Sequence, residues 1–123
     1  MIEVQVQDAA DTRDARLAAR TVVSSPLVKT MVTGCDPNMG RVMMALGRSG
    51  AQLEVDRIRV WIGEHLCFDQ GTATDVDYKL VSSAMQADEV KVRVSLGMGD
   101  GQAVAWGCDL TEGYIRINAD YTT

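Results

Sequence analysis

Alternation of apolar and polar residues marks the strands expected in this chain. Successive strand residues point to opposite faces of a sheet, so a period of two indicates one buried face. The pattern is clearest from Val90 to Leu96, where four apolar residues alternate with Lys91, Arg93 and Ser95. The same criterion predicts strands at 2–7, 57–62, 66–68, 102–106 and 114–118, with hairpin turns at 63–64 and 97–101.

Three further segments carry apolar residues at helical spacing. Asp11 or Thr12 can cap a helix that runs to about Val23. Asp36 followed by Pro37 predicts the cap and first residue of a second helix, which ends at Gly47. A third helix is expected over 75–87. The residues expected to face inward are Ala15, Ala18, Ala19, Val22, Val23, Met39, Val42, Met43, Leu46, Val76, Leu80, Val81 and Ala84. The segment 27–33, after the first helix, is apolar and β-branched.

Helices set against hairpins predict an α+β fold, with a mixed or mostly antiparallel sheet and about three helices. The length of 123 residues corresponds to a single domain, residues 1–123, that is large enough to bury a core. No apolar run approaches the ~20 residues of a membrane span. The first residues also lack the pattern of a signal peptide. We therefore expect a cytoplasmic protein without a membrane partner.

The net charge and the positions of the cysteines argue against nucleic acid and zinc as ligands. The net charge is −5 and the basic residues are dispersed, whereas a nucleic-acid binder would show a basic patch. Cys35, Cys67 and Cys108 are widely separated and His65 is the single histidine, which argues against a zinc site. We expect three reduced, mostly buried thiols, no nucleic-acid partner, and neither a metal nor another cofactor.

Two motifs invite a ligand-binding interpretation. The glycine-rich segment 97–101 is followed by a strand, whereas a dinucleotide loop is followed by a helix, so a turn is the better interpretation. Asp36, Asn38 and Arg41 gather at the start of the second helix. Such an end can be a structural cap, or it can attract a carboxylate through its dipole and free N–H groups. Spacing alone leaves both interpretations open.

Five strings of the chain resemble, in order and approximate spacing, signatures of the ornithine acetyltransferases, also called glutamate N-acetyltransferases. They are SPLVKT at 25–30, GCDPNMGR at 34–41, ALGRSG at 45–50, AWGCDLT at 105–111 and YIRINADYTT at 114–123. The resemblance spans nearly the whole chain and implies the C-terminal part of that enzyme's β chain. Met39 departs from the pattern, because the family usually has tryptophan there.

The resemblance implies a known chemistry for the complete enzyme. Family members cleave their own precursor and so expose a threonine at the start of the β chain. This threonine accepts acetyl from N-acetylornithine, and glutamate then takes the acetyl group from it. The reaction belongs to arginine biosynthesis. The Ala-Thr-Met-Leu string that carries this nucleophile is absent here. We therefore expect no catalytic residue in this chain. The implied partners are the upstream portion of the enzyme (α chain and N-terminal part of the β chain) within an oligomer, and the substrates N-acetylornithine and glutamate.

Substrate contacts implied by the resemblance fall in the closing segment alone. Asn118 matches the family's substrate-binding asparagine, and Thr123 matches its terminal threonine or serine. A rival hypothesis is a non-catalytic binding or regulatory module that retains the family fold. A third, an unrelated α+β ligand-binding domain, requires all five matches to be accidental.

Overall fold

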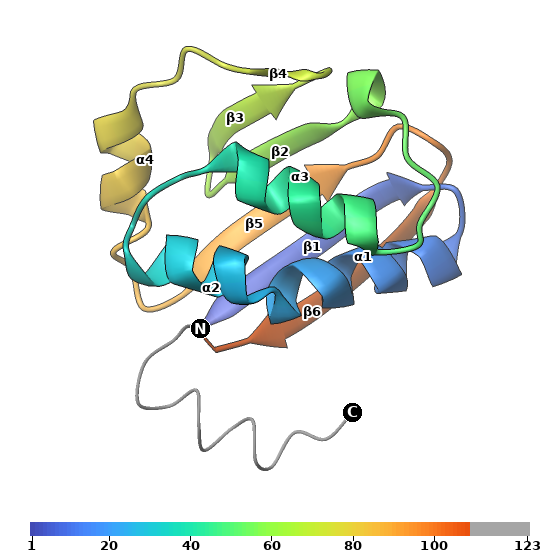
Figure 1. Ribbon diagram of the computed structural model, residues 1–123, viewed down its shortest axis with the longest axis horizontal. Helices are drawn as coiled ribbons and strands as arrows, with labels where there is room; N and C mark the ends of the chain where they lie inside the picture. Colours follow the sequence, from blue (N-terminus) through green and yellow to red (C-terminus); the bar gives the residue numbers. More distant parts are fainter. Residues whose placement is uncertain (109–123) are drawn as a thin grey trace.

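The computed structural model describes residues 1–108 and places them around one six-stranded sheet in the order β4-β3-β2-β5-β1-β6 (Figure 1). β5 pairs with β1 in parallel, and every other described pairing is antiparallel, so the sheet is mixed. The expected α+β fold is confirmed. The elements are β1 (Ile2–Ala9), α1 (Thr12–Ser24), α2 (Pro26–Thr33), α3 (Met39–Arg48), the 3-10 turn η1 (Val55–Arg57), β2 (Arg59–Ile62), β3 (His65–Asp69), β4 (Thr72–Ala73), α4 (Tyr78–Ala84), β5 (Val90–Ser95) and β6 (Gly101–Gly107).

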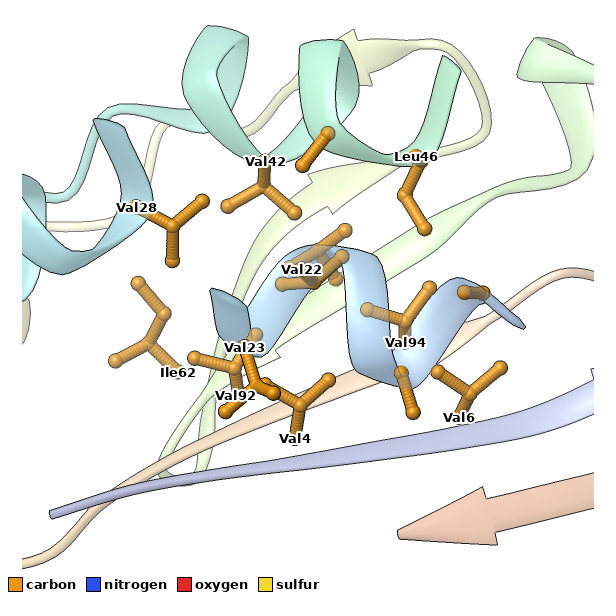
Figure 2. Packing of buried hydrophobic residues seen from close by; sticks show 14 of the residues in the cluster. Val4, Val6, Val22, Val23, Val28, Val42, Leu46, Ile62, Val92 and Val94 are labelled. Atoms are coloured by element: carbon orange, nitrogen blue, oxygen red, sulfur yellow. The ribbon is translucent and has the colours of Figure 1, made fainter. Parts of the chain in front are cut away.

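The core lies between the sheet and the helices α1, α2 and α3, which cover one of its faces (Figure 1). Figure 2 shows Val4 and Val6 of β1 facing Val22 and Val23 of α1, with Leu46 of α3 above them. The alanines of α1 that were expected to face inward are all buried, and their small side chains let the helix approach the strands closely. Each fully buried valine or leucine contributes roughly 1.5–3 kcal/mol relative to an exposed one.

α2 is a helix that the sequence pattern did not predict. Ser25 caps it, accepting a hydrogen bond from the Val28 N–H at 3.3 Å, and Pro26 supplies a preset φ at the first turn. Val28, Met31 and Val32 follow at helical spacing and are buried. The β-branched residues of this segment obscured that spacing, because they favour strands. Residues 1–108 therefore contain four α-helices where about three were expected.

α3 begins two residues later than expected, and its cap is Asn38 rather than Asp36. The Asn38 side-chain oxygen accepts from the Arg41 N–H at 3.4 Å, while the Asn38 backbone is still extended. Pro37 therefore precedes the helix, which continues to Arg48. The sequence contains two cap-forming residues on either side of Pro37, and the predicted position was wrong because Asp36 is bonded elsewhere, to the Tyr78 hydroxyl.

Asn38→Ala should lower the free energy of unfolding by about 0.5–2 kcal/mol, because it removes the side-chain acceptor at the start of α3. Asp36→Ala should have a smaller effect, since its one described side-chain bond is an exposed contact with Tyr78. Urea denaturation of both variants measures the difference. A larger loss for Asp36→Ala would restore Asp36 as the cap.

α4 is shorter than the predicted 75–87 helix and buries only part of its predicted face. Asp77 caps it through the Lys79 N–H at 2.9 Å. Leu80 and Ala84 were expected to face inward, but Leu80 is 56% exposed and Ala84 is exposed as well. Val81, which was also expected to face inward, is buried, and so is Met85 just past the helix. A helix of two turns fixes its phase poorly in the sequence, so the buried side was assigned only in part.

The segment 97–101 joins β5 to β6, but it is not the hairpin that was predicted, because β1 lies between those two strands. Alternation shows which face of a strand is buried, and it does not show which strands are neighbours. The segment packs on the turn after β1, where the Met98 N–H donates to the Asp8 carbonyl at 2.7 Å. At Gly101 a Cβ would overlap the backbone of Asp11. The β2–β3 hairpin at 63–64 is confirmed.

Candidate functional site

The two predicted substrate-binding residues, Asn118 and Thr123, lie outside the described residues, as does the predicted strand 114–118. β6, the strand that precedes them in the chain, ends at Gly107 on an edge of the sheet, beside β1. Their assignment as substrate contacts stays a prediction. Within residues 1–108, three features carry candidate chemistry: a cavity, a buried lysine and one face of the sheet.

A cavity of about 500 Å³ opens where the first turn of α3 meets β3, β4 and α4. Met39, which is 8% exposed, contributes to its wall, at the position where the resembled family usually has tryptophan. The full set of lining residues is Asp36, Pro37, Asn38, Met39, Gly40, Cys67, Ala73, Thr74, Val76, Tyr78 and Val81.

Polar groups of this cavity are bonded within the fold. The Tyr78 hydroxyl donates to the Asp36 carboxylate at 2.9 Å, and that hydrogen bond is the main reason why the pKa of Tyr78 is raised, ahead of desolvation and of repulsion by the same carboxylate. The Thr74 hydroxyl donates to the Leu66 carbonyl at 2.7 Å. The Arg41 guanidinium points to α2, donating to the Leu27 carbonyl at 3.2 Å. These bonds favour the structural interpretation of the segment that leads into α3.

Cys67 lies in the wall of the cavity on β3 and is 4% exposed. Burial raises the pKa of its thiol, because a thiolate is poorly solvated there. The three cysteines are free; Cys67 is buried, and Cys35 and Cys108 are half-buried. Cys67 therefore has the character of a packing residue.

Iodoacetamide should label Cys35 well before Cys67 in the folded protein, because the reagent needs both access and the thiolate. Since the pKa of Cys67 is raised, its labelling rate should reach half-maximum above the ordinary thiol value of about pH 8.5. Mass spectrometry of peptides from timed reactions measures both rates, with urea-unfolded protein as the control. Equal rates at pH 8 would contradict the burial of Cys67.

Lys29 is a buried charged residue that the sequence analysis did not select. It lies on α2 and is 9% exposed. Burial lowers the pKa of its ammonium group, and the neighbouring Cys108 acts in the opposite direction to a smaller extent. The signal available in the sequence was a single charge inside the apolar segment 27–33. The charge of Lys29 thus lies close enough to Cys108, just beyond β6, to be influenced by it.

The second face of the sheet is not covered by α1, α2 or α3 (Figure 1). We call it the open face. Two of its side chains are large, apolar and exposed on the edge strand β6: Val104 at 42% and Trp106 at 53%. Toward the middle of the open face the side chains are more polar, and most of them are half-buried. We define the open face by Glu3, Gln5, Trp61, Lys91, Arg93, Val104 and Trp106.

Similarity to known proteins shows the family to which this chain belongs. The model of the ArgJ family matches residues 1–123, the full length. The chain belongs to the ArgJ family. An arginine biosynthesis bifunctional protein ArgJ from Dehalococcoides mccartyi (strain CBDB1) is 49% identical over 123 residues, covering all of this chain and 30% of that protein. A glutamate N-acetyltransferase from Methanosarcina mazei is 45% identical over 128 residues, again covering the whole chain and 32% of the relative.

A solved ArgJ-family structure agrees with the fold. The crystal structure of the arginine biosynthesis bifunctional protein ArgJ from Bacillus halodurans superposes with a TM-score of 0.88 at 40% identity, covering 98% of this chain and 57% of that one. The expected resemblance to ornithine acetyltransferases is confirmed at the level of the family. The chain spans about a third of the length of the curated ArgJ relatives.

No group of three or more histidine, cysteine, aspartate or glutamate side chains within 1–108 is arranged to hold a metal ion. None of the helices in that range is both long and apolar enough to cross a membrane.

Proposed function

We propose that this chain is the part of a cytoplasmic glutamate N-acetyltransferase that completes the substrate pocket and packs against the rest of the enzyme. The complete enzyme would transfer acetyl from N-acetylornithine to glutamate in arginine biosynthesis, and an upstream portion would supply the nucleophilic threonine. The observation that carries the proposal is the ArgJ-family match over the whole chain. The names of the relatives, and the third of their length that the chain spans, support it.

The open face supports the proposal that this chain packs against the rest of the enzyme. A sheet with helices on one face commonly buries the other against a second layer. Trp106 and Val104 leave apolar surface on β6 exposed, and exposed aromatic residues are enriched where proteins interact. In the proposed enzyme the upstream portion covers this face, and the assembled enzyme forms an oligomer.

The test replaces the matched segment of the D. mccartyi ArgJ protein with this chain and assays acetyl transfer between N-acetylornithine and glutamate. The chimera should be active, whereas the chain alone should show no turnover above a mock preparation, since catalysis needs nucleophile, base and oxyanion donors together. Turnover by the chain alone would refute the proposal that an upstream portion supplies the nucleophile. An inactive but folded and self-cleaved chimera would refute the function, and would favour a binding or regulatory module.

In that chimera, Asn118→Ala and deletion of Thr122-Thr123 should each lower kcat/KM while leaving self-cleavage intact. An amide can donate and accept, and a terminal threonine adds a hydroxyl and a carboxylate, which suits an amino-acid substrate. Losing one hydrogen bond to a charged group costs about 1.5–3 kcal/mol, or roughly ten- to a hundredfold in kcat/KM.

Steady-state kinetics with both substrates measure the effect of these two changes. Gln102→Ala, a change of an exposed residue on β6, is the control. An unchanged kcat/KM in both the Asn118 variant and the truncated enzyme would remove the two residues from the substrate site.

A further inference from the structure

Arg93 lies near the middle of the open face with a charge that is held in place. It is on β5, level with Gln5 of β1 and Trp61 of β2. Its guanidinium carbon stands 4.2 Å from the centre of the Trp61 ring, a stacking geometry that orients the fork of donors. Within residues 1–108, Arg93 Nε is a buried side-chain nitrogen without a hydrogen-bond partner. A buried donor of this kind is destabilising unless an acceptor reaches it.

Two carboxylates on this side of the sheet are bonded to other donors. Glu3 accepts from Gln5 Nε2 at 3.2 Å and from Trp106 Nε1 at 3.0 Å. On the neighbouring strands Asp69 pairs with Arg59 at 2.9 Å. The guanidinium therefore presents a positive charge to whatever covers the open face.

We propose that Arg93, stacked on Trp61, is the anchor that binds a carboxylate on the remainder of the enzyme when the open face docks against it. This inference rests on the proposed function. About two-thirds of each relative's length lies outside the matched segment, so a partner of the required size belongs to the same enzyme. Arginine and tryptophan are the residues most enriched among those that dominate binding energy at the centre of interfaces.

A second copy of this chain fits the face less well. Two copies related by a twofold axis at the middle of the face would bring two Arg93 side chains together. Like charges at the centre of an interface oppose association. A partner that presents an acidic side chain at that point compensates the charge of the guanidinium.

The experiment compares Arg93→Glu, Arg93→Lys and the control Arg20→Glu, each in the isolated chain and in the D. mccartyi chimera. Arg20 is exposed on α1, on the helix-covered side, and undergoes the same charge change. We expect Arg93→Glu to lower the Tm of the chimera by at least ~5 °C. In the isolated chain the loss of Tm should be smaller, because only the stacking on Trp61 is lost there and the partner carboxylate is absent. Arg93→Lys should fall in between, since lysine keeps the charge and loses the fork.

The possible outcomes distinguish a failure of the proposed function from a failure of the Arg93 anchor. An unmodified chimera without acetyl transfer refutes the proposed function and this inference with it. An active chimera whose Tm responds equally to Arg93→Glu and Arg20→Glu refutes the anchor and leaves the function standing. An equal loss of Tm for Arg93→Glu in the isolated chain and the chimera shows a role within the chain, which also refutes the anchor. Sedimentation of the isolated chain as a dimer that Arg93→Glu dissociates shows that the occupant is a second copy.

Discussion

Gly101→Ala should lower the free energy of unfolding by at least about 3 kcal/mol. The Cβ of an alanine at this position would overlap the carbonyl group of Asp11, and both partners are backbone that cannot rotate away. Asp11 also caps α1 through the Asp14 N–H at 2.8 Å, so any shift that relieves the overlap disturbs the start of the helix. Urea denaturation followed by circular dichroism measures the loss.

Gly47→Ala is the matched control for that change. Gly47 lies exposed in α3, where a Cβ would meet nothing within 4 Å. Alanine is a better helix former than glycine, so this variant should gain about 0.5–1 kcal/mol. Opposite signs for the two glycine-to-alanine changes are the expected result. A stable Gly101→Ala variant would mean that the β6 entry and the turn before α1 are not in contact.

Leu46→Ala should cost about 2–5 kcal/mol, and Leu80→Ala should change stability by less than about 0.5 kcal/mol. The chemical change is the same in both. Leu46 is fully buried between α3 and the sheet (Figure 2), whereas Leu80 is 56% exposed on α4.

The pair also tests the corrected phase of α4, since periodicity had placed Leu80 in the core. Chemical denaturation of the two variants gives the comparison. Similar losses in both would show that α4 turns its Leu80 side inward after all.

The sequence predicted those elements whose local signals agree with one another. β1 alternates from Ile2 to Gln7, and α1 combines an aspartate cap, an alanine-rich stripe and a proline stop, so both were located within one or two residues. α2 was missed because its β-branched composition opposes its helical spacing. The cap of α3 was displaced because Asp36 and Asn38 are equally good caps, and a contact with Tyr78 distant in sequence separates them.

Strand order and the open face could not be predicted in the same way. They depend on which strands pair, and both hairpin-like turns looked alike in the sequence although only the one at 63–64 joins neighbours. Arg93 is singled out by its stacking on Trp61, which follows from the register of β5 against β2. Asn118 and Thr123 depend on family resemblance alone, since composition and periodicity give those positions no chemistry.

The position of β1 sets the order in which the sheet can form during synthesis. Among the described elements β1 is made before the others, yet Ile2 pairs with Val90 on one side and with Gly107 on the other. At about 5–20 residues per second, the ribosome leaves this apolar strand unpaired for about 5–20 s. Contacts between such distant parts of a chain also form slowly. β1 is therefore a segment that can aggregate during synthesis, and slow translation of the residues between β1 and β6 should increase aggregation.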